Sequence, residues 1–230
     1  MTLTACHCLD PQHETQKWSE LRLHSEPQDT NCEGWKHLID LVQQAAHDGR
    51  ELFAPGRLIP HDQWIQVVRL PPTIARLKAV KHLMLYGSNL VRIPPEIGEM
   101  TALETFTPYT SYRLHFFPYE ITRCSRLKES SVSTRALYGN EKYRPPFPRL
   151  PDISRGRTPE RCSVCAGSFQ ESGPLQFWVS LRVATDVLPL LVHACSHECV
   201  RRLPKPAKDC VPEPHQGGLE IKQTPGLYCR

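Results

Sequence analysis

Long apolar runs, a clear charge surplus and the common catalytic motifs are all missing from this chain of 230 residues. No uninterrupted apolar stretch approaches the roughly 20 residues that a membrane-spanning helix requires, which excludes an integral membrane protein. The 28 Lys and Arg residues exceed the 24 Asp and Glu residues only slightly, so charge alone does not predict a polyanionic partner. GxSxG, HExxH and P-loop motifs are absent, and no GxGxxG lies in a strand–helix context. These absences argue against an enzyme.

Cysteine and proline are, by contrast, abundant, with 10 and 22 residues respectively. The N-terminal segment has neither the basic region nor the apolar core of a secretory signal, so we expect a cytoplasmic protein. Structural disulfides are rare in a reducing cytosol, which leaves metal ligation, burial as small apolar residues, or free thiols as the roles of these cysteines. The arrangement of the cysteines along the chain therefore decides between these roles.

An amphipathic helix is predicted after an irregular N-terminal arm. Residues 1–30 carry five acidic side chains and no sustained apolar periodicity, which predicts a weakly packed acidic arm. From Trp35 to Ala46, apolar residues recur at helical spacing and form one stripe. Asn31 is a suitable N-terminal cap for this helix, and Gly49 is a suitable C-terminal stop.

From Leu70 onward the chain repeats its own pattern. Apolar residues of the first unit recur 23 residues later, and a third unit follows after a further 24; the sets are Ile74, Leu77, Val80 and Leu83, then Ile97, Met100, Leu103 and Phe106, then Ile121, Cys124 and Leu127. A unit of this size cannot bury its own apolar edge, so neighbouring units must stack.

This pattern resembles the short leucine-rich repeat of intracellular proteins, with the consensus LPxxIxxLxxLxxLxLxxNxLxxIP. The match covers roughly residues 58–140 and is closest over residues 70–94. It departs from the consensus at Ser88 and Ser111, which stand where the family places an Asn that satisfies the backbone. The resemblance implies buried strand leucines, with the residues between them projecting from a concave face.

The alignment gives this concave face an adaptable apolar patch with hydroxyl groups, a surface that suits a protein partner. The full set of projecting residues is His82, Met84, Tyr86, Thr105, Thr107, Tyr109, Glu129, Ser131 and Ser133. We expect the partner to contact His82, Met84, Tyr86, Thr107 and Tyr109. The alternative is that the arm or the C-terminal module folds back over these side chains.

Two cysteine pairs form the strongest motif of the chain. Cys162 and Cys165 lie in RCSVC, and Cys195 and Cys199 lie in VHACSHECV. A CxxC pair and a CxxxC pair separated by about thirty residues can complete one tetrahedron around Zn²⁺. Four thiolates leave no open coordination position, so the predicted zinc is structural rather than catalytic. The alternatives are four buried or free thiols, or His193 or His197 as a ligand.

The segment between the pairs predicts two apolar strands at residues 175–181 and 185–193, and a helix begins near Ser196. A turn, hairpin and helix with ligands at both ends resemble a treble-clef zinc finger, and the CSxEC ending is similar to that of TRASH-type fingers. Cys6, Cys8 and Cys32 could also hold a metal, although an arm rich in chelating residues is the favoured interpretation. Cys124 is predicted to be buried, and Cys210 and Cys229 have no predicted partner.

Together these patterns predict an α+β fold, in which a short leucine-rich repeat solenoid is capped by an N-terminal amphipathic helix. A small zinc-binding β-hairpin and helix module follows. The predicted boundaries are 1–30 for the arm, 31–148 for the helix cap and repeats, 149–215 for the zinc module and 216–230 for a tail.

The function predicted from these modules is non-catalytic protein–protein docking by a protein with a structural zinc site. A nucleic-acid-associated zinc protein is the alternative, because arginines gather around the predicted finger. A thiol-dependent enzyme similar to bacterial leucine-rich repeat ubiquitin ligases comes third, since no positioned base accompanies a cysteine. We expect an unidentified protein partner and neither nucleic acid, a membrane nor a small-molecule substrate.

Overall fold

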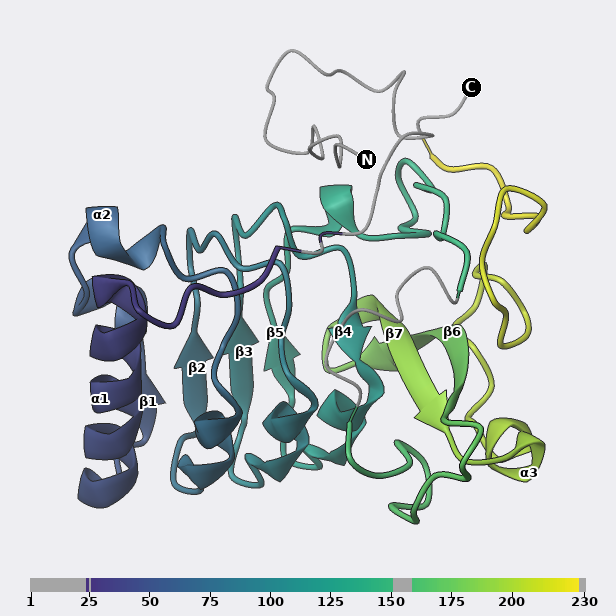
Figure 1. Cartoon of the computed structure of the whole chain (residues 1–230). Coiled ribbons are helices and arrows are strands. Elements are labelled where there is room, and N and C mark those ends of the chain that lie inside the picture. The colour runs from purple at the N-terminus through teal and green to yellow at the C-terminus, as the bar shows by residue number, and fades with distance from the viewer. Residues whose placement is uncertain (1–23, 25, 151–158, 228–230) are drawn as a thin grey trace. The chain divides into compact units, whose positions relative to one another are not determined.

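The computed structural model describes residues 24, 26–150 and 159–227 (Figure 1). Most of the predicted acidic arm lies outside the described residues, as do Cys6, Cys8 and Cys229. The chain divides into two compact units. The first consists of Glu26–Ser133 together with Arg182–Asp186, and the second consists of the described parts of Thr134–Leu181 and Val187–Arg230.

Helix α1 (Glu33–Asp48) confirms the predicted amphipathic helix. Its buried face includes Leu38, Val42 and Ala45, which are spaced for one side of a helix. Gly49 ends the helix in the left-handed conformation at φ 62°, as the sequence predicts. The N-terminal cap is Cys32 rather than Asn31, and its side chain makes no capping hydrogen bond. The Asn31 N–H donates to a side-chain oxygen of Asp29 in the preceding turn.

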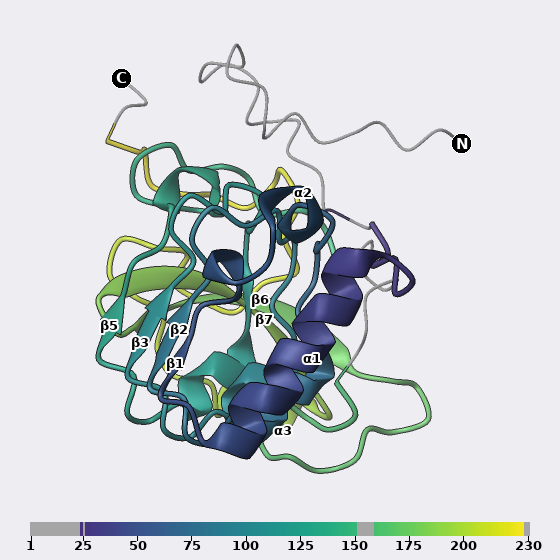
Figure 2. The ribbon, with the colours of Figure 1, turned by 90° about the vertical axis from the view of Figure 1, so that its left-hand side faces the viewer.

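The first unit contains a four-stranded parallel sheet in the order β1–β2–β3–β5. The strands are β1 (Leu52–Phe53), β2 (His82–Met84), β3 (Thr105–Thr107) and β5 (Glu129–Ser130). Their register follows the sequence repeat, since Leu83 pairs with Phe106 and Phe106 pairs with Ser130. Figure 2 shows these strands beside one another, with α1 near the β1 end.

A short 3₁₀ helix precedes each of the last three strands of this sheet. These helices are η3 (Pro72–Arg76), η4 (Pro95–Glu99) and η5 (Tyr119–Arg123), and they bury Ile74, Ile97 and Ile121. Prolines begin η3 and η4, where a missing N–H costs nothing. A Cβ at Gly98 would lie 2.6 Å from the backbone oxygen of Glu120, so only glycine allows η4 to approach η5 this closely. Two further short helices, η2 (Pro55–Arg57) and α2 (His61–Trp64), lie between β1 and η3.

The predicted fold class, an α+β fold built on a short leucine-rich repeat solenoid, is wrong. The chain is α/β, with a parallel sheet of four strands and a mixed sheet of three strands. The physical reason lies in the connections: a parallel strand pair needs a crossover that returns the chain to the same end of the sheet. Here η3, η4 and η5 supply those crossovers, so strands and short helices alternate along the chain.

The outer edge of β5 is closed by the tip of a later hairpin. Ser130 directs its backbone N–H and C=O away from β3, and the hydroxyl of Thr185 bonds to both, accepting at 3.1 Å and donating at 2.8 Å. The Ser130 hydroxyl donates to a carboxylate oxygen of Asp186 at 2.7 Å. One threonine hydroxyl therefore takes the place of a neighbouring strand at a sheet edge that would otherwise be open.

The second unit is built around the hairpin of β6 (Leu175–Val183) and β7 (Asp186–Ala194), which confirms the two predicted strands. The three-stranded sheet has the order β4–β7–β6, and its strand β4 (Phe117–Pro118) comes from the range Glu26–Ser133, not from the second unit. The core of this unit is aromatic, with ring centroids of Tyr138, Phe147 and Trp178 about 6 Å apart and His215 against Phe147 at 4.6 Å. The helix η6 (Thr134–Ala136) precedes this cluster.

None of the helices in the described ranges is long and apolar enough to cross a bilayer.

Candidate metal centre

The first cysteine pair lies on a tight turn that presents both sulfurs to one side. The Ala166 N–H donates to the Cys162 carbonyl at 2.9 Å, and the Cys162 N–H donates to the Gly167 carbonyl at 2.8 Å. Ala166 adopts φ 58°, a left-handed conformation that closes this turn. The Gly167 N–H also approaches the Cys165 sulfur at 3.4 Å. Backbone N–H groups therefore surround the pair in the way that suits thiolates.

The second pair lies where β7 ends and helix α3 (His197–Arg201) begins. Ser196 caps α3, and its hydroxyl accepts from the Cys199 N–H at 3.3 Å. The Cys195 N–H donates to the Cys162 sulfur at 3.3 Å, which joins the two pairs directly. The helix start predicted near Ser196 is thus confirmed.

The structure brings the four predicted cysteine sulfurs together. The ligand atoms of Cys162, Cys165, Cys195 and Cys199 all lie within 4.8 Å of one another. The Cys195 sulfur is 3.6 Å from the sulfur of Cys165 and 3.6 Å from that of Cys199. Thirty residues of hairpin separate the pairs, so this convergence comes from the fold. The cluster is close enough to hold a metal ion.

The thiols of this cluster have divergent pKa values. Burial alone would raise the pKa of Cys162, but N–H groups of Cys165, Val164 and Cys195 lower it to about 7. Burial, followed by the neighbouring thiols, raises the pKa of Cys199 to about 12. A bound cation would stabilise all four thiolates together, so metal binding must release protons. Outside the cluster, burial raises the pKa of Cys124 to about 11, as its predicted place in the core requires.

The two histidines considered as rival ligands lie outside this cluster. His197 is exposed on α3, and the ring of His193 lies 3.0 Å from the Gln176 amide nitrogen. The backbone of His193 pairs with Ser163: the His193 N–H donates to the serine hydroxyl at 3.0 Å, and its carbonyl accepts from the Ser163 N–H at 2.8 Å. Ser163 thus fixes the first turn against β7, a supporting role that its position between two cysteines did not indicate.

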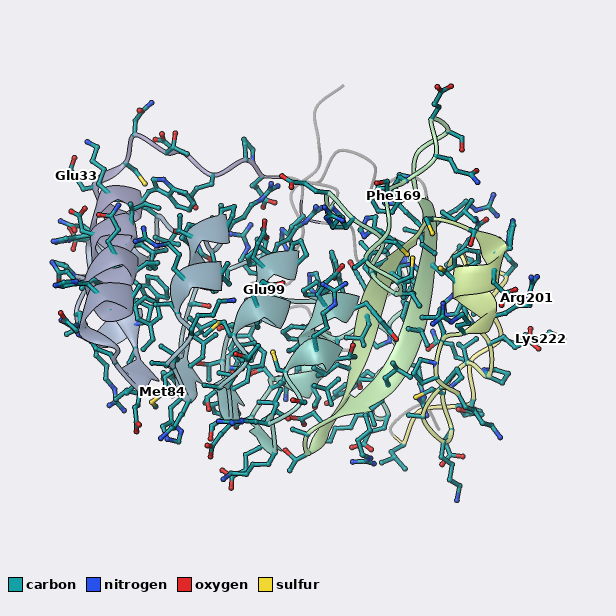
Figure 3. The ribbon with its side chains drawn as sticks, turned by 90° about the horizontal axis from the view of Figure 1, so that it is seen from below. Glu33, Met84, Glu99, Phe169, Arg201 and Lys222 are labelled. Atoms are coloured by element: carbon teal, nitrogen blue, oxygen red, sulfur yellow. The ribbon has the colours of Figure 1, made fainter. Side chains whose placement is uncertain are left out.

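The residues predicted to contact a partner lie in the other unit, within strands β2 and β3 or two residues beyond their ends. His82, Tyr86 and Tyr109 are exposed, while Met84 and Thr107 are half-buried. The rings of Tyr86 and Tyr109 are 60% and 47% exposed, and their centroids are 5.9 Å apart. Of the other projecting residues, Ser133 is buried and accepts a hydrogen bond from the Thr110 N–H, so it cannot contact a partner. Figure 3 shows Met84 on the strand side of this unit and Glu99 on the short helix η4.

Two buried serines, Ser88 and Ser111, form a hydrogen-bonded pair beside the parallel strands. The Ser111 hydroxyl donates to the Leu85 carbonyl at 3.0 Å and lies 2.6 Å from the Ser88 hydroxyl, and both serines are buried.

Comparison with known proteins adds no relative: no protein-family model matches the chain, and no curated protein sequence matches it.

Proposed function

We propose that this protein is a non-catalytic docking protein whose second unit is stabilised by a structural zinc ion. The observation that carries the proposal is the convergence of four cysteine sulfurs within 4.8 Å. A tetrahedron with Zn–S bonds of about 2.3 Å has sulfur–sulfur edges of about 3.8 Å. Two of the sulfur separations, both 3.6 Å, are close to that edge.

The donor set supports zinc as the metal and structure as its role. Soft thiolates in a tetrahedral arrangement select zinc among common divalent ions, and harder cations such as Mg²⁺ and Ca²⁺ prefer oxygen donors. A complete set of four protein ligands leaves no position for water or substrate. Zinc in such a site contributes to folding, which suits a hairpin that ends in a helix of only five residues.

The exposed tyrosine pair supports the docking part of the proposal. Tyr86 and Tyr109 lie two residues beyond the ends of β2 and β3 and expose two large rings with hydroxyl groups. Two lysines that precede β2 and β5 are paired with carboxylates, Lys81 with Glu51 and Lys128 with Glu104. Exposed tyrosine rings suit a protein partner, because aromatic residues are enriched at protein–protein interfaces. The resemblances to leucine-rich repeats and to treble-clef fingers, and a cytoplasmic location with reduced thiols, are parts of the same proposal.

Elemental analysis of the purified full chain tests the zinc site, with about one zinc per chain as the expected result. Protein without zinc, and without a rise in thermal stability when zinc is added, would contradict it.

The docking surface is tested by a double variant, Tyr86→Ala with Tyr109→Ala. Since both rings are largely exposed, we expect the free energy of unfolding to fall by no more than about 1 kcal/mol. Capture of partner proteins on the immobilised chain should fall strongly, with Tyr112→Ala, another exposed tyrosine, as the matched control. Equal capture by the parent and the double variant would contradict the assignment of this surface.

A further inference from the structure

The four cysteines of the metal centre differ in their access to solvent. Cys162 is fully buried and Cys199 is only 4% exposed, whereas Cys165 is exposed and Cys195 is half-buried. A small oxidant arriving from solvent therefore meets Cys165 first. Oxidation of cysteines follows exposure and thiolate character, so these four sulfurs are not chemically equivalent.

The two accessible sulfurs are also neighbours. The sulfur of Cys165 lies 3.6 Å from that of Cys195. A disulfide requires about 2.05 Å, so the two atoms must approach by about 1.5 Å, a distance within reach of side-chain rotation. Cys199 lies equally near Cys195 but is buried on the inner side of the cluster.

We propose that Cys165 and Cys195 form an oxidation site, at which a peroxide joins the two sulfurs in a disulfide. The Cys165 thiolate attacks one peroxide oxygen and becomes a sulfenic acid, while the O–O bond breaks and hydroxide leaves. The Cys195 thiolate then attacks the oxidised sulfur and displaces a second hydroxide. Two thiolates, one hydrogen peroxide and two protons thus give one disulfide and two waters; the sulfurs are oxidised and the peroxide is reduced.

This reaction would remove ligands from the metal centre and still leave the two segments of the site crosslinked. It removes two of the four ligands, so the metal becomes available to a chelator; this consequence rests on the proposed zinc site. The new bond joins the turn at Cys162–Gly167 to the end of β7, the same two segments that the metal would join. One crosslink therefore replaces another, and a dithiol reductant would restore the original state.

Peptide mapping of the full chain tests the site. Zinc-loaded protein is treated with increasing hydrogen peroxide, remaining thiols are alkylated, and the digest is analysed by mass spectrometry for disulfide-linked peptides. Released zinc is followed in parallel with a chromogenic chelator.

We expect the first disulfide to link Cys165 to Cys195, zinc release to follow its formation, and a dithiol to reverse both. The Cys165→Ser variant should form the first disulfide at least about ten times more slowly, while Cys210→Ser, which changes a half-buried cysteine outside the cluster, should match the parent.

The outcomes separate this inference from the proposed function. A first disulfide that links Cys195 to Cys199, or Cys162 to Cys165, would overturn the inference, as would peroxide treatment that modifies other cysteines first. Protein that binds no zinc would contradict the proposed function, but the disulfide map of that protein would still decide the pair. The mapping of the parent chain does not depend on any variant folding correctly.

Discussion

Acid should destabilise the second unit through one buried histidine, His215. Its ring packs edge-on against Phe147 at 4.6 Å, and its Nδ1 atom accepts a hydrogen bond from the Gly217 N–H at 3.1 Å. The backbone of His215 pairs with that of Trp178, which holds the ring in the core. Burial lowers the pKa of His215 from 6.5 to about 4. The folded state therefore holds this ring in its neutral form.

The sign of the pH effect follows from proton binding. Below about pH 6.5 the unfolded chain takes up a proton at this residue and the folded chain does not, so stability falls as the pH falls. The loss grows until the pH reaches about 4, where the folded protein is protonated as well. From the two pKa values, this residue should remove about 2 kcal/mol of unfolding free energy between about pH 7.5 and pH 5, and about 3 kcal/mol in full.

Urea denaturation of the parent and of His215→Asn at both pH values measures this effect. The asparagine oxygen retains an acceptor for the Gly217 N–H but does not titrate, so the variant should lose about 2 kcal/mol less than the parent on acidification. Protonation of the four clustered thiols affects both proteins and cancels in the comparison. His61→Asn, at an exposed histidine, serves as the control and should behave as the parent does. Parallel pH dependences of the parent and His215→Asn would refute the reasoning.

Three further substitutions test single features. Cys199→Ser should lower bound zinc from about one per chain to a trace, whereas Cys210→Ser should retain it; equal zinc by elemental analysis would contradict the ligand assignment. Thr110→Gly should raise the unfolding free energy by about 0.5–1 kcal/mol, because a β-branched residue there holds φ 61°; an unchanged urea midpoint would count against backbone strain. Thr185→Val should cost about 1 kcal/mol by removing both hydrogen bonds to Ser130, and Thr185→Ser should restore most of it in the same titration.

Local periodicity and motif spacing predicted a large part of the structure. The stripe from Trp35 to Ala46 predicted α1, because an amphipathic helix shows its buried face in the order of its residues. The two cysteine pairs predicted the cluster of four sulfurs that could hold a metal ion, because their spacing is that of metal-ligand pairs. The strands of the hairpin were also predicted, although β6 extends to Val183, two residues beyond its predicted end.

Features that depend on distant contacts were not predicted. The contact between Thr185 and Ser130 spans 55 residues, and no local pattern marks either residue. His215 likewise has no local signal: it is the last residue of the predicted zinc module, and its burial depends on Phe147 and Trp178, which lie far from it in the sequence. The error in fold class has a related cause. The sequence repeat aligns Leu83 with Phe106, which are paired in the sheet, but the α/β class depends on how the strands connect.

The hydroxyl of Thr185 limits where a further strand-containing unit could be inserted into this chain. A further copy of the 23-residue unit inserted after β5 would need the backbone groups of Ser130 that Thr185 already occupies. Duplication of a unit before β5 would instead leave that contact intact and simply widen the sheet. Insertions during evolution or in design should therefore be tolerated among β1, β2 and β3, and rejected between β5 and the hairpin.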